Sequence, residues 1–317
     1  MVRFTVLASG SKGNATVLTG GRTRILVDCG LSCRELFRRM KLAGEEPETL
    51  DAIVITHEHS DHVNGVAVTA RKLGIRVYFT EGTHRAWMRW LSPRKNLTYA
   101  QWLERMRKQA AERQAEAEAT EEGEPDESDL VEPPVESVEP DEPAKGKEPT
   151  WLPSVEYFAS GEPFEIGDIR ISPFTIPHDA ADPVGFVFQT EGVRLAYATD
   201  LGYIPPNVKA QLQRVDLLLL ESNHDLEMLK DGPYPWAVKQ RVLSRVGHLS
   251  NEAAAGFLES DYDGQAAYVI LAHLSESNNL PEMARVAAER ALQGRATLLA
   301  NRLLLAMQHE PLSSILF

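Results

Sequence analysis

The sequence lacks the features that define several classes of protein. Its 317 residues include only two cysteines, Cys29 and Cys33, which excludes a disulfide framework and makes a reducing cytoplasm the expected location. No stretch approaches the roughly 18 uninterrupted apolar residues of a transmembrane helix, so we expect no membrane association. The first residues have no apolar run of about seven or more and therefore predict no signal peptide. With 43% hydrophobic residues, the chain can bury a sizeable globular core.

Basic residues are fewer than acidic ones, and the net charge of −13 at first argues against a polyanionic substrate. The imbalance is local, because residues 112–150 hold 15 acidic and 3 basic residues, many prolines and no aromatic residue. The rest of the chain holds 31 acidic and 30 basic residues, so nucleic acid stays open as a substrate. The acidic, proline-rich segment at 112–150 can bury too little apolar surface to offset the entropy lost when a chain becomes ordered. We therefore expect an insertion at about 100–150, in which a helix at 99–114 leads into a disordered acidic tract at 112–150 that is suited to docking a protein partner.

Outside this insertion, patterns with the period of a strand and of a helix alternate along the chain. We expect strands at residues 2–7, 16–19, 23–27, 51–55, 75–79, 164–166, 169–174, 184–189, 193–197, 216–220, 268–271 and 296–300. We expect helices at residues 32–43, 62–73, 206–213, 234–246, 250–259 and 280–293. This order predicts an α/β (α+β) fold in one domain over 1–317, with two sheets inside and helices outside. We expect one half from each side of the insertion.

The strongest local motif is ITHEHSDH at residues 55–62, where an apolar strand stops and a helix begins. It offers four potential metal ligands within six residues: His57, His59, Asp61 and His62. Two imidazoles two residues apart can hold one divalent cation, and a carboxylate with a third imidazole can hold another beside it. A lone histidine is usually a surface or core residue, but four such groups at the end of one strand favour a metal site.

Three more residues of ligand type follow expected strands. His178 follows the strand at 169–174, Asp200 the strand at 193–197, and His273 the strand at 268–271. Asp200 has an alternative as a turn residue before Gly202. As a bridging carboxylate it would place one oxygen on each of two cations. Two other histidines, His84 and His309, are interpreted as incidental helix or surface residues.

The motif HxHxDH, followed by a histidine, an aspartate and a histidine at strand ends, resembles the metallo-β-lactamase superfamily. Further motifs narrow the resemblance to the YycJ/WalJ-like branch, which is close to the RNase Z-type phosphodiesterases. They are SGSKGNAT at 9–16, LVDCG at 26–30, PHDAADPVGF at 177–186, TDLGY at 199–203, ESNHD at 221–225, GHLSNEAA at 247–254 and HLSESNN at 273–279. The resemblance implies a four-layer αββα sandwich with two divalent metal ions, zinc or manganese. The acidic insertion departs from the family, which is usually shorter there.

The resemblance also implies a role for individual residues. His57, His59 and His178 would bind the first metal, Asp61, His62 and His273 the second, and Asp200 would bridge the two. Asp28 would support the ligand histidines, and His248 would lie near the scissile phosphate without binding metal. Ser9, Asn14 and His224 are expected to contact the substrate, with Ser9 and Asn14 in a tight glycine-rich connection near the site.

These residues predict a two-metal hydrolase, most simply a phosphodiesterase or nuclease that acts as an exonuclease on DNA or on RNA. A metal-bridging hydroxide would attack phosphorus, Asp61 would orient it, and His248 would protonate the leaving oxygen. Alternatives are a hydrolase of a small ester, thioester or cyclic phosphodiester, and a non-catalytic binding protein on the same scaffold. A full set of ligand residues argues against the last.

Two other features admit a simple and a functional interpretation. Cys29 adjoins Asp28, yet a buried small residue is favoured over a redox or nucleophilic cysteine, because no base stands at a fixed spacing. Four basic residues share one expected helix, Arg34, Arg38, Arg39 and Lys41, and four more cluster near another, Arg85, Arg89, Arg94 and Lys95. They form either a solvated helix face, the favoured interpretation, or a track for a nucleic-acid backbone.

Overall fold

Two seven-stranded sheets form the centre of the computed structural model, which describes residues 1–91, 151–293 and 302–317. The first sheet has the order β14-β1-β2-β3-β4-β5-β6 and the second β13-β12-β11-β10-β9-β8-β7. The first contains β1 (Arg3–Ala8), β2 (Ala15–Gly20), β3 (Thr23–Val27), β4 (Ala52–Val54), β5 (Arg76–Phe79), β6 (Ser154–Tyr157) and β14 (Ile315–Leu316). The second contains β7 (Phe164–Ile166), β8 (Ile169–Thr175), β9 (Val184–Thr190), β10 (Val193–Ala198), β11 (Leu217–Glu221), β12 (Tyr268–Ala272) and β13 (Arg302–Leu305).

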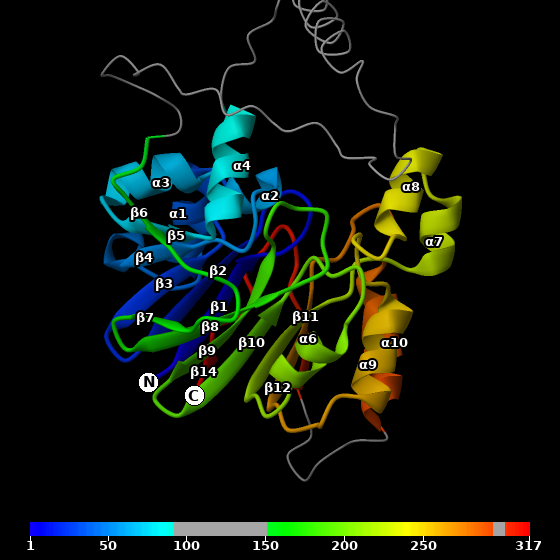
Figure 1. Ribbon diagram of the computed structural model, residues 1–317. Coiled ribbons are helices and arrows are strands. Elements are labelled where there is room, and N and C mark those ends of the chain that lie inside the picture. Colours follow the sequence, from blue (N-terminus) through cyan, green and yellow to red (C-terminus); the bar gives the residue numbers. More distant parts are fainter. Residues whose placement is uncertain (92–150, 294–301) are drawn as a thin grey trace, which may run out of the picture. The chain divides into compact units, whose positions relative to one another are not determined.

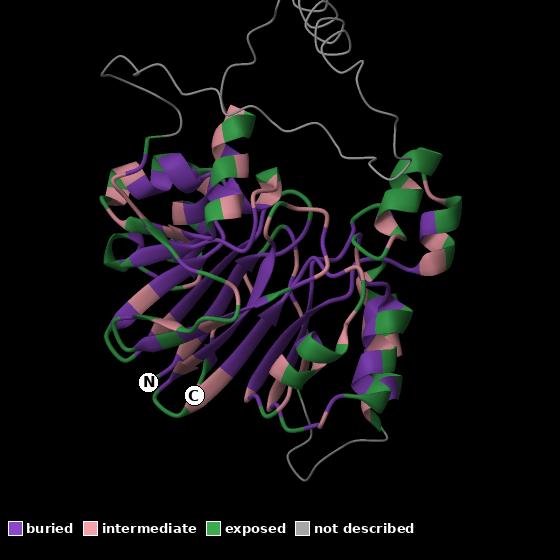
Figure 2. Cartoon of the chain, viewed as in Figure 1, coloured by how far each residue is buried: buried purple, intermediate pink, exposed green. Residues whose placement is uncertain are grey.

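Helices cover the outer face of each sheet (Figure 1). They are α1 (Cys33–Leu42), α2 (Ser60–Val63), α3 (Val66–Leu73), α4 (Glu81–Leu91), α6 (Pro206–Gln211), α7 (Leu226–Asp231), α8 (Trp236–Val242), α9 (Asn251–Ser260) and α10 (Pro281–Gln293), with a 3₁₀ turn at Pro47–Thr49. Helices α1, α3 and α4 share an apolar cluster with the first sheet, and α6, α9 and α10 share another with the second. A third cluster lies between the sheets, where Phe4 and Val27 meet Phe186 and Leu219. The expected four-layer αββα sandwich is confirmed. Its strands are largely buried, and the helices outside them have both buried and exposed residues (Figure 2).

Local sequence signals account for most elements. The helix expected at 32–43 begins after Ser32, whose hydroxyl accepts a hydrogen bond from the Glu35 backbone N–H. The helix expected at 62–73 is instead two helices, α2 and α3, and the break falls at Gly65. A side chain at Gly65 would lie 2.0 Å from the Leu31 carbonyl oxygen. The helical periodicity of residues 62–73 runs through Gly65, because periodicity carries no information about a close approach to another segment of the chain.

The expected division of the two sheets at the insertion is wrong. Strands β6 and β14 lie after residue 150, yet both belong to the first sheet, where β6 pairs with β5 and β14 with β1. Both strands were missed, because short or half-exposed segments carry little periodicity. No bounds were predicted for helices α4 and α7. The last expected strand, placed at 296–300, lies at Arg302–Leu305. The expected insertion and the helix at 99–114 lie outside the described residues.

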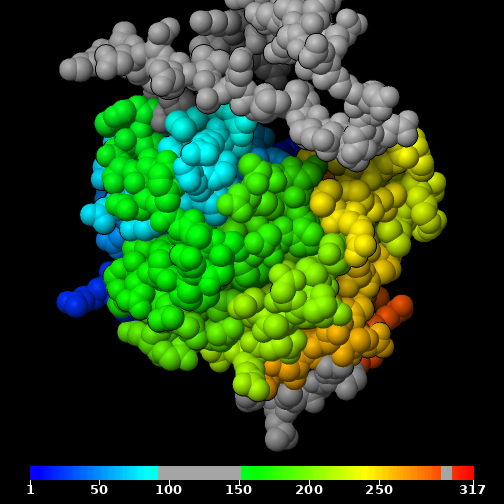
Figure 3. Space-filling model, in the orientation of Figure 1, coloured from blue at the N-terminus to red at the C-terminus, as the bar shows by residue number. Residues whose placement is uncertain are grey.

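The direction of the strands places several strand ends at one edge of the structure. Strands β10, β11, β12 and β13 are parallel, and β8 runs with β10 because each is antiparallel to β9. The carboxyl ends of β8, β10, β11 and β12 therefore meet at the same edge of the second sheet. Strands β3 and β4 of the first sheet are also parallel. In the space-filling view, α4 (cyan) and the chain around α8 (yellow), which are far apart in sequence, lie toward the same end of the structure (Figure 3).

The structure supports the simple interpretation of Cys29 and shows where two of the arginines lie. Cys29 is fully buried, and burial raises the pKa of its thiol to about 12, which fits a buried small residue. Arg39 is also buried and donates hydrogen bonds to the carbonyl oxygens of Leu7 and Gln308. Arg38 pairs with Glu35 on the same helix. Within the described ranges, no helix is long and apolar enough to span a lipid bilayer.

Replacing Phe186 with alanine tests the packing between the sheets. Its ring is fully buried and lies 5.7 Å from the Phe158 ring and 5.6 Å from the Phe188 ring, centroid to centroid. F186A should lower the free energy of unfolding in urea by about 3–5 kcal/mol, since it leaves a cavity. V68A, on α3 with a side chain 52% exposed, should change it by no more than about 0.5 kcal/mol. Equal losses for the two variants would contradict this description of the core.

Candidate metal centre

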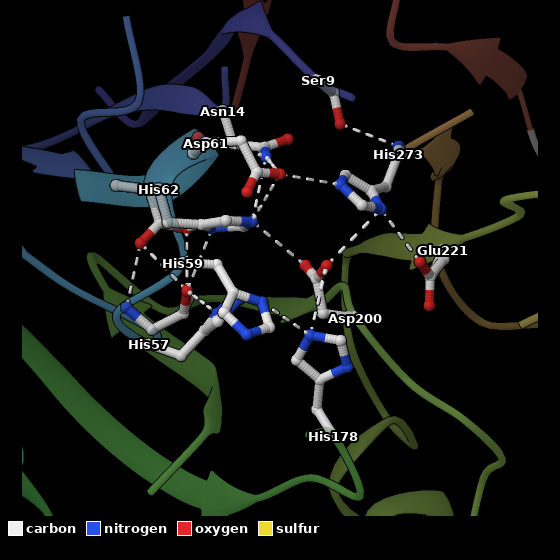
Figure 4. Close-up of polar contacts among 12 residues, drawn as sticks. Ser9, Asn14, His57, His59, Asp61, His62, His178, Asp200, Glu221 and His273 are labelled. Atoms are coloured by element: carbon white, nitrogen blue, oxygen red, sulfur yellow. Dashed lines mark hydrogen bonds and ion pairs between the residues drawn. The ribbon is translucent and has the colours of Figure 1, made fainter. Parts of the chain in front are cut away.

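Side chains of ligand type converge at the edge where the strand ends meet (Figure 4). His178 follows β8, Asp200 follows β10, Glu221 ends β11 and His273 follows β12. The residues of ITHEHSDH follow β4 from the first sheet. Three residues of this region, Asp28, Asp200 and His273, have φ angles of 58°, 62° and 57°. This left-handed conformation costs non-glycine residues about 1–3 kcal/mol and is found where the surrounding structure imposes it, as at functional sites.

One group of side chains consists of His57, His59 and His178, whose ring nitrogens lie within 4.8 Å of one another. His178 Nε2 is 3.2 Å from His59 Nδ1, and the His57 ring lies 4.6 Å and 5.0 Å from the other two, centroid to centroid. Burial and then the neighbouring imidazoles lower the pKa of His57 well below its ordinary value. His178 Nδ1–H donates to the Gly247 carbonyl oxygen at 3.1 Å, which leaves Nε2 facing the group.

A second group consists of Asp61, His62 and His273. Asp61 Oδ2 lies 3.5 Å from His62 Nε2 and 3.4 Å from His273 Nε2. On the far side of its ring, His62 Nδ1–H donates to Asp28 Oδ2 at 2.8 Å, and the other Asp28 oxygen accepts from the Thr56 backbone N–H. Burial opposes ionisation of Asp61, but the charge of His62 and the hydrogen bond from His273 outweigh it and hold the pKa of Asp61 below its usual range.

Asp200 lies between the two groups. Its Oδ2 is 3.4 Å from His62 Nε2, and its Oδ1 is 3.9 Å from His178 Nε2 and 3.5 Å from His273 Nδ1. The side chain is almost fully buried, with 2% of the residue exposed. The carboxylate is therefore near both histidine groups, with Oδ2 beside His62 and Oδ1 near both His178 and His273, and such a position suits a bridging ligand.

The donor atoms fit divalent cations. In the part of the chain that the structure describes, His57 Nε2 and Asp200 Oδ2 are buried without a hydrogen-bond partner. Leaving a buried polar atom unpaired costs about 1–3 kcal/mol, and more for a charged group, so these atoms call for a further partner. A cation would supply that partner and would remove the repulsion among neighbouring imidazoles. Imidazole and carboxylate donors suit both zinc and manganese.

Glu221 is a site residue that the sequence reasoning missed. Its Oε1 accepts hydrogen bonds from His248 Nδ1 at 2.8 Å and from His273 Nδ1 at 3.0 Å, and its Oε2 accepts from the Leu201 backbone N–H. Burial opposes ionisation of Glu221, but the charge and hydrogen bond of His248 keep its pKa below the usual range. The signal was present, because Glu221 ends the apolar strand LLLLE just as Asp200 and His273 follow theirs.

His248 lies at the rim of the site. Its ring is 5.2 Å from the His178 ring and 5.2 Å from the His273 ring, centroid to centroid, and its side chain is 20% exposed. Burial lowers the pKa of His248, but the Glu221 carboxylate raises it more, so the pKa lies above its ordinary value. His248 Nδ1 is occupied by Glu221, which directs the opposite ring nitrogen away from that carboxylate.

The three residues expected to contact substrate are all buried. Ser9 Oγ accepts a hydrogen bond from the His273 backbone N–H, and Asn14 Nδ2 lies 3.2 Å from Asp61 Oδ2. His224 is 1% exposed, and burial lowers the pKa of its imidazole to about 4. Substrate contact therefore stays a prediction for these residues, while the geometry of Ser9 and Asn14 favours a role in positioning His273 and Asp61. The incidental interpretation of His84 fits its place beside Tyr157, away from the site.

The segment that contains Ser9 and Asn14 is held by the C-terminal part of the chain. Gln308 Oε1 accepts a hydrogen bond from the Lys12 backbone N–H, and Gln308 Nε2 donates to the Gly13 carbonyl oxygen. The Ser9 backbone N–H donates to the Met307 carbonyl oxygen. Residues near both ends of the described chain thus shape one wall of the site.

Comparison with known proteins identifies the family. Residues 8–238 match the Metallo-beta-lactamase superfamily, a range that includes HxHxDH, His178 and Asp200. The chain belongs to the metallo-β-lactamase superfamily. It is 32% identical over 292 residues to the Exodeoxyribonuclease YycJ of Bacillus anthracis, covering 92% of this chain and 89% of that protein. It is 32% identical to the Exodeoxyribonuclease WalJ of Streptococcus pneumoniae, covering 90% of this chain and 86% of that protein.

Solved structures show the same fold. The metallo-beta-lactamase fold protein YhfI from Bacillus subtilis matches with a TM-score of 0.60 at 14% identity, over 98% of both chains. At this identity, the match supports the superfamily fold alone.

Replacing Asp28 with asparagine tests the support of His62. D28N keeps the shape of the side chain but removes the charge that accepts from His62 Nδ1, so zinc affinity should fall roughly 10- to 100-fold. Competition with a chromophoric chelator measures that affinity. D51N is the matched control, because Asp51 is exposed and accepts a backbone hydrogen bond far from the histidines. If both variants bound zinc as the unmodified chain does, Asp28 would have no such role.

Proposed function

We propose that this member of the metallo-β-lactamase superfamily is a metal-dependent phosphodiesterase that removes nucleotides from the ends of DNA. The observation that carries the proposal is the position of His248. Glu221 fixes its ring, which lies beside the two groups of potential metal ligands that Asp200 joins. A histidine that can donate a proton beside two metal sites suits the cleavage of a phosphodiester. The relatives named exodeoxyribonuclease, similar over nine-tenths of this chain, support DNA as the polymer.

The first metal ion would be held by His57, His59 and His178, and the second by Asp61, His62 and His273. Asp200 would hold both, since its carboxylate lies near His178 of the first group and near His62 and His273 of the second. When bound, two divalent cations, zinc or manganese, activate water and stabilise the charge of a phosphodiester as it is cleaved. Asp28 would keep His62 oriented from behind, and Glu221 would do the same for His273.

The side chains have separate tasks in this proposal. Asn14 lies against Asp61 Oδ2 and would hold that carboxylate in the orientation needed to direct the attacking water. His248 would carry a proton on the ring nitrogen opposite Glu221. As the P–O bond breaks, the N–H bond of His248 breaks too, and the proton forms an O–H bond on the leaving oxygen. Glu221 would favour the protonated imidazole before this step and fix its direction throughout.

Replacing His248 with alanine separates the proton donor from the metal ligands. H248A should keep the metal content of the unmodified protein and lower turnover of labelled DNA by roughly 10²- to 10⁴-fold, since one proton donor is lost. Metal analysis and single-turnover cleavage of end-labelled oligonucleotides measure the two effects. H309A is the matched control, because the His309 side chain is 69% exposed and contacts only the Glu276 carboxylate at the surface among the ion pairs of the described residues. Unchanged turnover in H248A would remove His248 from the mechanism.

Metal removal tests the proposed function as a whole. A strong chelator should abolish cleavage of DNA, and added Mn²⁺ or Zn²⁺ should restore it, because the donor groups would otherwise remain unfilled. The substrates are 5′- and 3′-labelled DNA, matching RNA and bis-p-nitrophenyl phosphate. Cleavage of the small diester alone would replace the proposal with a small-molecule hydrolase. No cleavage of any diester with either metal would refute a phosphodiesterase.

A further inference from the structure

One arginine side chain lines the cleft above the candidate metal centre. The walls of this cleft include His59, Asp61 and His248. Arg241, on α8, is the only lysine or arginine among the described residues of those walls. None of the seven residues of α8, all of which the structure describes, is buried. Helix α8 and its side chains are therefore held by contacts at the surface and not by the core.

An ion pair fixes the direction of the Arg241 side chain. Arg241 Nε–H donates a hydrogen bond to Asp179 Oδ2. The other carboxylate oxygen, Asp179 Oδ1, is buried and lies 3.5 Å from His178 Nε2 and 4.0 Å from His59 Nε2. Asp179 therefore stands between the guanidinium and the histidines that would hold the first metal ion, and the guanidinium lies one carboxylate away from them.

The contact with Asp179 uses one of the three nitrogens of the guanidinium. Within the described residues, the two terminal nitrogens of Arg241 form no hydrogen bond or ion pair, and 60% of the side chain is exposed. The Asp179 backbone N–H also donates to the Val246 carbonyl oxygen, which ties the chain after α8 to the same segment. An arginine is always charged, and its planar pair of terminal nitrogens matches the oxygens of a phosphate. Arg241 thus presents a phosphate-binding group to the cleft in a fixed direction.

We propose that Arg241 binds the phosphate next to the scissile one in the strand that is cleaved. This inference rests on the proposed phosphodiesterase function. The scissile phosphate would lie at the two groups of metal ligands, and the Asp179 carboxylate separates Arg241 from the first of these groups. The arginine is therefore placed for a neighbouring phosphate of the same strand. A polynucleotide has such a phosphate and a small diester has none, so Arg241 would favour the polymer.

The test combines removal of the arginine with removal of one charge from the DNA. The value of kcat/KM for the first cleavage is measured for the unmodified protein and for R241A. The substrates are an oligonucleotide and versions in which one phosphate is replaced by an uncharged methylphosphonate, at successive linkages from the end. On the unmodified strand, R241A should lower kcat/KM by roughly 10- to 150-fold, the effect of one hydrogen bond to a charged group. At one linkage beside the cleaved one, the methylphosphonate should lower kcat/KM of the unmodified protein by a similar factor and leave R241A almost unchanged.

A small diester and a second arginine serve as controls. R241A should bind zinc and cleave bis-p-nitrophenyl phosphate as the unmodified protein does, because that compound has a single phosphate. Arg38 is 54% exposed and is paired with Glu35 on α1, and it is not among the residues that line the cleft. R38A should therefore cleave DNA as the unmodified protein does. R241K should recover part of the loss, since a lysine binds phosphate as a point charge without the paired donors.

Three results would overturn the inference. The first is normal cleavage of DNA by R241A. The second is a methylphosphonate effect that is equally large in R241A and in the unmodified protein at every linkage. The third is a loss of zinc affinity or of bis-p-nitrophenyl phosphate cleavage that matches the loss on DNA, because Arg241 would then act on the metal centre through Asp179. If the unmodified protein with metal cleaved no DNA, the proposed function itself would fail, which is a different result from an active protein in which R241A has no effect.

Discussion

The burial of ionisable groups at one sheet edge is the constraint on which the rest of this structure depends. His57, His62 and His273 are almost wholly removed from water, together with Asp200 and Glu221. Charged groups are stable in such surroundings only when each is paired. Part of this pairing comes from the protein itself, because the outward-facing nitrogens of His62, His178 and His273 are hydrogen-bonded to Asp28, Gly247 and Glu221, respectively. The inward-facing atoms are left to one another and to a ligand.

The directions of the strands in the two sheets make that arrangement possible. Parallel strands of the second sheet deliver one residue each to the same edge, and the loop after β4 of the first sheet delivers several more. The side chains reach their positions through backbone conformations that the strands alone would not favour, as at Asp200 and His273. Apolar clusters on both faces of each sheet hold the strand ends in place, so the site's geometry derives from the core and not from the loops alone.

Much of this could be predicted from the sequence, for definite reasons. Helix α1 and the strands around His178, Asp200 and His273 have strong periodicity, and each ligand-type residue stands directly after an apolar run. Glu221 was missed because a glutamate at a strand end has many possible roles until its partner His248 is seen beside it. The break at Gly65 and the return of β14 to the first sheet depend on contacts with distant segments, which no local pattern contains.

The C-terminal strand has a consequence for the order of events during folding. β14 pairs with β1, and Met307 and Gln308 bind the backbone of residues 9–13, beside Asn14 and therefore beside Asp61. The segment before Asn14 thus depends on a segment that comes far later in the sequence. Until residues 302–317 are in place, the first sheet has an open edge at β1, and the wall next to Asp61 lacks its support. Contacts between segments so far apart in the sequence close a long loop, so this wall of the site is expected to form late in folding.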